Sequence, residues 1–302
     1  MKKLLPILIC IVLLLSGCRQ SAYSTDFFAM DTFMNATVYG ADLTKEIESE
    51  VLRIDAMLSL TNEKSDTNIY NNGGEVSDEF NSLLLYCKNL KEKTSGAFDV
   101  SIQPFCDLWQ NSVPTDKQIE NAKSIEKIGF GAIGKGYAAG KVRSILKENG
   151  VTSAVISLGG NVCLVGRDVD GTKWQVGIQH PKKTDEIIAS ITAEDTAVVT
   201  SGGYQRYFEQ DGVRYHHIID PNTKKPSESG IISATIITPD DALADAFSTA
   251  VYVMGVEKAT KLYRQNDFEM IIVTDDTVFY TEGLQNDFKL FDNDFKTELI
   301  TK

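Results

Sequence analysis

Asp245 and Thr249 lie four residues apart in the segment A-L-A-D-A-F-S-T-A, with Ser248 beside them. Residues at i and i+4 share one face of a helix, so a helix here would point the carboxylate and the hydroxyl the same way. Both are hard oxygen ligands that suit Mg²⁺ rather than Zn²⁺, and two such ligands leave places for waters and a phosphate-bearing substrate. The alternative is a polar helix end with Asp240 and Asp241 near its cap.

A second candidate is the pair His216-His217 in the segment Y-H-H-I-I-D-P-N-T-K-K-P. A histidine at the end of a strand, beside a tight turn, can accept a proton near neutral pH and act as a general base. Arg206 stands in the preceding segment, T-S-G-G-Y-Q-R-Y-F, and a plain hairpin needs neither the arginine nor the histidines. The alternative is that both histidines are half-buried strand residues with satisfied hydrogen bonds.

Two glycine-rich runs would let the backbone approach a ligand closely. The run G-A-I-G-K-G at residues 131–136 precedes an expected helix, whose free first-turn N–H groups attract phosphate. It matches neither a Walker loop nor a dinucleotide fingerprint, and Lys135 fits a phosphate contact and a solvated helix start equally well. The run L-G-G-N at residues 158–161 follows an apolar strand and by itself indicates only a turn.

Two strands joined by a turn must position Arg206 and the histidines. Residues 196–208 and 213–219 are predicted as these strands, with Q-D-G at 210–212 as the turn. The motif D-P-N-T at 220–223 then ends the second strand, because proline lacks an N–H and Asp and Asn favour turns.

The rest of the chain mixes helices with strands and contains few βαβ units. This pattern predicts the α+β class, a single mixed domain rich in antiparallel strands with flanking helices. Helices are predicted over 47–58, between a cap at Ser77 and Gly96, from the 131–136 run to Gly150, and over 240–252 and 256–266. Further strands are predicted over 28–39, 152–157, 173–179, 186–192, 231–238, 269–274 and 277–281.

Residues 1–17 resemble a bacterial lipoprotein signal peptide. Lys2 and Lys3 precede an apolar run of about a dozen residues, which is too short to span a bilayer. Cys18 in L-S-G-C would be acylated and become the mature N-terminus, and residues 18–25 would form a lipidated tether. We therefore expect an exported protein in the bacterial cell envelope, facing the periplasm or the cell exterior. The alternative is an ordinary signal peptide with an incidental cysteine.

Residues 26–302 show no repeat, linker or break in composition, so one domain is expected. Loss of Lys2 and Lys3 with the signal peptide would change the formal net charge from −12 to −14. Such a chain repels nucleic acid and anionic lipid, so we expect no nucleic-acid partner and membrane contact only through the lipid anchor. The cysteines beyond Cys18 form neither a disulfide framework nor a zinc motif, and we expect them to be buried apolar residues: Cys87, Cys106 and Cys163.

The order of these segments resembles the ApbE family. F-A-M-D-T, S-G-A-F-D, G-A-I-G-K-G-Y-A, S-L-G-G-N and the three segments quoted first follow one another over about residues 26–290. Members of this family are flavin transferases that attach FMN from FAD to proteins, and many are periplasmic lipoproteins. The resemblance implies a mixed α+β fold, FAD as substrate, Mg²⁺ as cofactor, and target proteins that receive FMN, which we expect to be membrane-associated redox subunits.

Matched motif by motif, the resemblance implies a role for each candidate residue. Asp245 and Thr249 would be side-chain ligands of Mg²⁺, and Ala132 would offer its backbone carbonyl to the same ion. His217 would be the general base that takes the proton from a target Thr or Ser hydroxyl, whose oxygen attacks the phosphorus on the FMN side while AMP leaves. The residues that would lie along FAD are Met30, Ala97, Phe98, Asp99 and Lys135.

The chain departs from the family pattern at three places. Asp31 stands where the family usually has a glycine, and Gly129 stands where many relatives have an aspartate, which removes a potential FAD contact. The run from 109 to 129 is short for the family, which normally has an extra strand pair there. The metal ligands are unchanged, so the departures bear on FAD affinity and on the nucleotide end of the site.

Two other functions fit parts of the same pattern. One is a Mg²⁺-dependent FAD pyrophosphatase that splits FAD into FMN and AMP with water as the nucleophile. The other is a non-catalytic lipoprotein that stores or delivers FAD. Binding alone needs no base, so Asp245, Thr249 and His217 together favour an enzyme.

Cys18→Ser should release the protein from the membrane fraction, because serine offers no thiol for acylation. Fractionation of cells that express the unmodified chain or the variant, followed by immunoblotting, measures this. A variant that stays in the membrane fraction as the unmodified chain does would contradict the lipid anchor.

Overall fold

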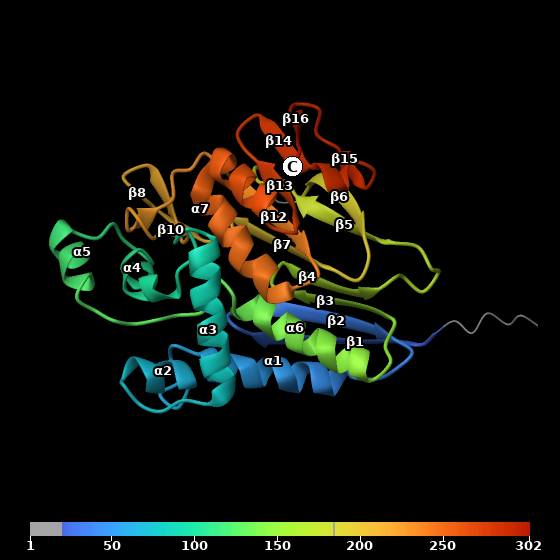
Figure 1. The fold of residues 1–302 in the computed structure, drawn as a ribbon, viewed down its shortest axis with the longest axis horizontal. Coiled ribbons are helices and arrows are strands. Elements are labelled where there is room, and N and C mark those ends of the chain that lie inside the picture. Colours follow the sequence, from blue (N-terminus) through green and yellow to red (C-terminus); the bar gives the residue numbers. More distant parts are fainter. Residues whose placement is uncertain (1–19, 184) are drawn as a thin grey trace, which may run out of the picture.

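The computed structural model describes residues 20–183 and 185–302, so Cys18 and the expected signal peptide lie outside the described residues. A nine-stranded sheet in the order β1-β2-β3-β4-β7-β12-β13-β14-β16 forms the centre of the molecule (Figure 1). Neighbouring strands are antiparallel except β14 and β16, which are parallel. The strands are β1 (Ala22–Ala29), β2 (Thr32–Tyr39), β3 (Ser153–Leu158), β4 (Asn161–Gly166), β7 (Ala197–Gly202), β12 (Ser233–Thr238), β13 (Glu269–Val273), β14 (Thr277–Thr281) and β16 (Lys296–Ile300).

Long helices cover one face of this sheet and enclose the main apolar core with it (Figure 1). The longest, α7, is kinked at Gly255, whose φ of 76° is left-handed. The helices predicted over 240–252 and 256–266 correspond to its two parts. The helices are α1 (Thr44–Leu58), α2 (Asp66–Asn71), α3 (Asp78–Lys93), η1 (Val100–Ile102), α4 (Gln103–Leu108), α5 (Asp116–Ala122), α6 (Gly134–Glu148), α7 (Asp241–Gln265) and η2 (Glu282–Leu284).

A three-stranded sheet in the order β15-β6-β5 packs on the opposite face, over a second apolar cluster. Central strands of the large sheet are therefore buried on both sides, which explains their nearly continuous apolar runs. The α+β class with mainly antiparallel strands is thus confirmed. The smaller sheets contain β5 (Trp174–Gln179), β6 (Ile187–Ala193), β8 (Tyr207–Gln210), β9 (Val213–His216), β10 (Ile219–Asp220), β11 (Lys225–Pro226) and β15 (Phe288–Leu290).

The prediction of one strand over residues 28–39 is wrong, because this region is a hairpin. Met30 and Asp31 have φ values of 47° and 57°, and they join β1 to β2 in a two-residue turn. Positive φ at both turn residues fits the right-handed twist of a hairpin, although glycine and asparagine are the usual residues there. The sheet consequently begins at Ala22, within the tether expected over residues 18–25.

The strand predicted over 196–208 is also divided. β7 ends at Gly202, and β8 begins at Tyr207. In the turn between them the Gln205 N–H donates to the Gly202 carbonyl at 3.4 Å. The strand predicted over 213–219 is likewise divided at His217 into β9 and β10. β8 and β9 therefore form a separate hairpin, and Arg206 and His217 meet at its base.

The short run from 109 to 129 folds around α5. The Thr115 hydroxyl accepts from the Gln118 N–H, and the Gln118 side chain accepts from the Thr115 N–H, a complete capping box. Trp109 anchors this region by donating from Nε1 to the Lys224 carbonyl at 2.9 Å. Across residues 20–183 and 185–302, no helix combines the length and apolar character needed to cross a membrane.

A buried ion pair fixes α6 to the start of α7. The Arg143 guanidinium donates to both carboxylate oxygens of Asp241, from Nε at 2.7 Å and from Nη2 at 3.0 Å. Its Nη1 donates to the Leu164 carbonyl of β4 at 2.7 Å. These bonds fix the positions of α6, α7 and β4 relative to one another, next to the glycine-rich start of α6.

Candidate active site

Several of the predicted site residues lie at one end of the large sheet. The β1–β2 turn and the β3–β4 turn lie at this end, because Met34 pairs with Leu158. Gly159, with a φ of 58°, packs so closely on Thr32 that a Cβ there would overlap its side chain. β7 also ends here. The middle of α7 approaches β7 at Ser201, and the start of α6 contacts α7 at Asp245.

Asp245 is buried, with 3 % of its surface exposed, and contacts the first turn of α6. The backbone N–H of Gly136 donates to its Oδ2 at 2.8 Å. In a regular helix that N–H would donate to the carbonyl four residues earlier, which belongs to Ala132. No hydrogen bond to the Ala132 carbonyl is found in the described part of the chain. Asp245 thus leaves the Ala132 carbonyl available as an oxygen ligand.

Thr249 lies one turn further along α7 and contacts the end of β7. The Ser201 hydroxyl lies 2.8 Å from the Ser248 hydroxyl and 3.3 Å from Thr249 Oγ1. The Ser248 hydroxyl in turn donates to the Asp245 carbonyl at 2.8 Å. This chain of hydroxyls fixes the Thr249 side chain against the end of β7, and the spacing of four residues places it on the same side of α7 as Asp245.

These oxygen donors fit a magnesium ion. Within residues 20–183 and 185–302 no group of three or more His, Cys, Asp or Glu side chains is placed to hold a metal. One carboxylate, one hydroxyl and one carbonyl suit Mg²⁺, which usually binds through one or two carboxylates and completes its shell with phosphate and water.

His217 follows β9 directly and has one free ring nitrogen. Its Nδ1 lies 3.0 Å from the Arg206 carbonyl, which can only accept, so Nδ1 carries the proton. In the neutral ring Nε2 then holds a lone pair. Burial lowers the pKa of His217 to about 4, and the positive charges of Arg206 and Lys135 act in the same direction. Solvent reaches part of the residue and moderates the effect, but the ring is neutral at pH 7.

His216 lies in a different environment and uses both ring nitrogens. Its Nε2 donates to the Ser227 carbonyl at 3.0 Å, and its Nδ1 accepts from the Ile218 N–H at 3.2 Å. The ring also meets Tyr252 edge-on, with the ring centroids 5.3 Å apart. His216 therefore has no nitrogen free for a proton transfer and acts as a structural residue.

The residues expected along FAD at Met30 and at 97–99 make contacts within the protein. Met30 donates from its N–H to Asp55 Oδ2 at 3.1 Å, at the turn of the first hairpin. Ala97 and Phe98 are buried in the main core, with 6 % and 1 % exposed. Asp99 binds Lys91 at 2.6 Å and accepts from Ser101, which together outweigh burial and lower its pKa. This segment is therefore a stable backbone support rather than a source of free polar side chains.

The departure at Gly129 has a structural counterpart in Gln103. A Cβ at position 129 would overlap Oε1 of Gln103, so the Gln103 side chain fills the space that a side chain at position 129 would occupy. Gln103 is held there by a 2.6 Å bond from its Nε2 to Asp107. The Gly129 N–H also donates to the Val100 carbonyl at 2.9 Å, which joins the segment after Asp99 to the segment before Ala132.

Comparison with known proteins assigns the chain to a family. The model of the ApbE family matches residues 30–272, which include every metal-binding and FAD-binding candidate and His217. The chain belongs to the ApbE family.

Solved and curated members of the ApbE family resemble the chain over most of its length. The FAD:protein FMN transferase of Vibrio cholerae is 28 % identical, with 93 % of this chain and 96 % of the relative covered. The ApbE protein of Thermotoga maritima superposes with a TM-score of 0.76 at 31 % identity, covering 84 % and 94 %. The apo flavinyl transferase ApbE of Pseudomonas stutzeri also gives 0.76, at 25 % identity, covering 85 % and 92 %.

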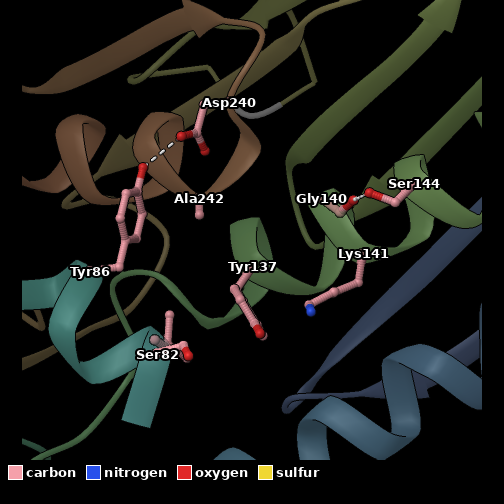
Figure 2. A pocket seen from close by; sticks show the side chains of 9 residues that line it. Ser82, Tyr86, Tyr137, Gly140, Lys141, Ser144, Asp240 and Ala242 are labelled. Atoms are coloured by element: carbon pink, nitrogen blue, oxygen red, sulfur yellow. Dashed lines mark hydrogen bonds between the residues drawn. The ribbon is translucent and has the colours of Figure 1, made fainter. Parts of the chain in front are cut away.

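A cavity of about 370 Å³ lies outside this ApbE-type site (Figure 2). It opens between α3, α6 and the start of α7, and its polar groups are already paired. Tyr86 donates to Asp240 at 2.6 Å. Tyr137 donates to Glu79 at 2.8 Å, and Lys141 forms an ion pair with the same carboxylate at 3.0 Å. None of the predicted site residues lines this cavity, and no free polar side chain in its lining would select a ligand.

Sequence reasoning missed two residues that shape the site. Ser201 is 48 positions from Thr249, so no spacing rule links the two hydroxyls. Gln103 has no signal in the sequence, which shows only that Gly129 lacks a side chain. The T-S-G-G motif is the one signal for Ser201, since glycines that follow a serine at a strand end permit a close approach.

Gly129→Asp should lower the free energy of unfolding by about 0.5–1.5 kcal/mol, because the new side chain forces the partly exposed Gln103 side chain into another rotamer. Urea unfolding measures this. Gln103→Ala in the same chain should restore most of the loss, since it removes the overlapping atoms, and Gln103→Ala alone is the control. A double variant as unstable as Gly129→Asp would contradict the overlap.

Proposed function

We infer that this chain is a FAD:protein FMN transferase, which moves FMN from FAD to a Thr or Ser hydroxyl of an acceptor protein and releases AMP. Curated relatives carry this name over about nine-tenths of the chain. The observation in this molecule that best supports it is His217. Its bond to the Arg206 carbonyl leaves Nε2 as a free base, which a flavin-binding protein without catalysis does not need.

The reaction needs one proton acceptor and a positive environment. His217 Nε2 takes the proton from the acceptor hydroxyl while the hydroxyl oxygen forms a bond to the phosphorus on the FMN side of FAD. The bond from that phosphorus to the bridging oxygen breaks, and the electron pair leaves with AMP. The cations of Lys135 and Arg206, whose fields reach His217, favour the negative charge that the phosphates carry there.

Asp245, Thr249 and the Ala132 carbonyl would hold Mg²⁺ as the cofactor. When bound, Mg²⁺ supplies positive charge against the FAD diphosphate. The fit of one buried carboxylate, one oriented hydroxyl and one unused carbonyl supports this assignment. A chain with a formal net charge of −12 also needs local cations to bind a diphosphate.

The proposed setting is the bacterial cell envelope. Cys18 would carry the lipid anchor, with the domain facing the periplasm or the cell exterior, and the acceptors would be membrane-associated redox subunits. The signal-like composition of residues 1–17 supports this proposal.

Hydrolysis of FAD to FMN and AMP is a second candidate, favoured by the exposure of His217 to solvent. Water can reach Nε2 when no acceptor protein covers it. The same residues would serve, with water in place of the hydroxyl, so AMP release without an acceptor measures this activity separately.

Asp245→Ala should abolish AMP release from FAD, because the ion would lose its one carboxylate ligand while it faces a diphosphate. Thr249→Ala should be milder, since a water can replace a neutral hydroxyl. Chromatography of AMP formed with Mg²⁺ or with EDTA measures both. Glu257→Ala, which alters an exposed carboxylate on the same helix, is the control. Full AMP release in EDTA would rule out the metal.

His217→Ala should reduce flavin transfer by about 10²–10⁴-fold, the usual contribution of a general base, while FAD affinity changes only a few-fold. His216→Ala should alter stability rather than the chemical step, because both nitrogens of His216 serve hydrogen bonds. Single-turnover flavin transfer at saturating FAD compares the two variants. Equal losses in both would remove His217 from the mechanism.

The pH dependence of kcat/KM is a second test of the role of His217. The pKa of His217 in the folded chain lies below its ordinary value, so Nε2 stays unprotonated as the pH falls from 7 to 6. We expect the acid limb of kcat/KM for FAD to lie below pH 6.5, nearer to 4. An acid limb at or above 6.5 would show that the ring is not desolvated.

A further inference from the structure

The first hairpin leaves part of one face of the large sheet open, at the edge that β1 and β2 form (Figure 1). Buried side chains of the hairpin, such as Phe27, Met34 and Val38, belong to the main core beneath the helices, so the alternate side chains point to the opposite face. The small sheet β15-β6-β5 packs on that face, but its apolar cluster contains no residue of β1 or β2 in the described part of the chain. Trp174 of β5 meets Tyr39 at the end of β2, with ring centroids 6.3 Å apart. The remaining open face points away from α7 and its candidate metal ligands.

Two phenylalanine rings project from this open face. Phe28 of β1 and Phe33 of β2 are 56 % and 82 % exposed, the latter the largest exposed fraction of any large apolar side chain in the described part. They are cross-strand partners, and their rings meet edge-on with centroids 5.4 Å apart. The pair forms an apolar patch at the end of the hairpin that lies farthest from the start of β1.

Between the aromatic pair and the start of β1 the open face is polar but carries little charge. The hydroxyls of Ser24 and Thr37 lie 2.9 Å apart and form a hydrogen bond across the strands. Asp26 is the one charged residue in the two strands, and it accepts from Asn35 Nδ2 at 2.7 Å. Asp31 adds one exposed carboxylate in the turn. The face therefore carries only a small part of the formal net charge of −12.

The expected lipid anchor would hold this face close to a bilayer. Cys18 lies outside the described residues, but Ser21 is already bound to the sheet, because its carbonyl accepts from the Gly40 N–H at 2.9 Å. Three residues of chain reach at most roughly 11 Å, so the start of β1 stays within that distance of the acylated residue. From Ser21 a strand extends roughly 23 Å to Phe28, at about 3.3 Å per residue. So short a tether gives the open face a high effective concentration at the bilayer, which lets even a weak apolar contact form.

We propose that the open face of the first hairpin is a membrane-docking surface. The lipid on Cys18 holds one end of the hairpin at the bilayer, and the rings of Phe28 and Phe33 enter the boundary between headgroups and acyl chains at the other end. The proposal rests on the lipid anchor proposed above, and it replaces the expectation that the anchor alone touches the membrane. The membrane-docking surface consists of six side chains that point away from the helices: Ser24, Asp26, Phe28, Phe33, Asn35 and Thr37.

Zwitterionic lipid fits this surface better than two other partners. A second copy of the chain would bring the carboxylates of Asp26 and Asp31 close to their own counterparts, and anionic lipid would repel them. A zwitterionic headgroup offers the same carboxylates a positive charge. Because the membrane-docking surface points away from α7, the docked domain keeps the candidate metal ligands on the aqueous side.

Phe33→Trp in the lipidated full chain, reconstituted in phosphatidylcholine vesicles, tests the contact. Lipids brominated near the top of the acyl chain quench tryptophan that enters the boundary region. We expect them to remove about half or more of the fluorescence that the variant adds to that of the unmodified chain. Leu85→Trp is the matched control, since Leu85 is 62 % exposed on α3 and α3 packs on the main core, and its added fluorescence should not be quenched.

Replacing phosphatidylcholine by phosphatidylglycerol should weaken the quenching of the Phe33→Trp chain at low salt, because Asp26 and Asp31 then face anionic headgroups. Stronger quenching on phosphatidylglycerol would overturn the preference for zwitterionic lipid. AMP release from FAD should be unchanged in both tryptophan variants, since neither residue lies at the candidate site.

A Phe33→Trp chain that sediments with the vesicles but is not quenched would overturn the membrane-docking surface and leave the anchor intact. Equal quenching of the Leu85→Trp chain would also overturn it, since the domain would then have no preferred face. Cross-linked dimers with unquenched fluorescence would assign the face to a second copy instead. Failure of the unmodified chain to sediment with the vesicles would contradict the anchor itself, so the two failures are distinguishable.

Discussion

The contact between Gly136 and Asp245 is the constraint on which the rest of the site depends. A side chain at Gly136 would overlap the Asp241 carbonyl and the Asp245 Cβ, so only glycine lets α6 and α7 approach so closely. Its N–H then turns from the helix to the Asp245 carboxylate, which both fixes that carboxylate and leaves the Ala132 carbonyl unused. A single backbone donor thus sets the position of two of the three proposed metal ligands.

The Arg143–Asp241 ion pair maintains this approach from one turn earlier on α7, at the start of the helix. The desolvation free energy of two buried charges offsets much of their Coulomb attraction, so the pair is weak evidence that the fold is stable. Its geometry is specific, however, because both carboxylate oxygens and the Leu164 carbonyl are engaged. We attribute to it the fixed register between the helices that Gly136 requires, rather than a large share of the folding free energy.

Sequence patterns predicted the features that depend on residues close together in the chain, and they missed several that depend on the folded backbone. The Ser77 cap is confirmed, since its hydroxyl accepts from the Phe80 N–H at 3.2 Å, and most strands lie where apolar runs predict them. The Met30-Asp31 turn was missed, because non-glycine residues rarely adopt positive φ and no local signal marks it.

Side-chain geometry within the candidate site was the least predictable. The proton on Nδ1 of His217 follows from a carbonyl eleven residues away, at the base of a hairpin whose strands were predicted too long. The match of Gln103 to Gly129 links positions 26 residues apart, and no periodicity relates them. The i,i+4 rule placed Asp245 and Thr249 on one side of a helix. The contact of Ser201 with Thr249 depends on the packing of β7 against α7, which no local pattern predicts.

The solvent exposure of His217 has a consequence for repeated cycles. An imidazolium formed in an environment that disfavours charge is a strong acid, and it passes its proton quickly to nearby water. The open side of the residue provides that route once the flavinylated product departs. With His217 as the proposed general base, no second residue is needed to remove its proton, and the rate of a full cycle would depend on how fast the product uncovers the ring.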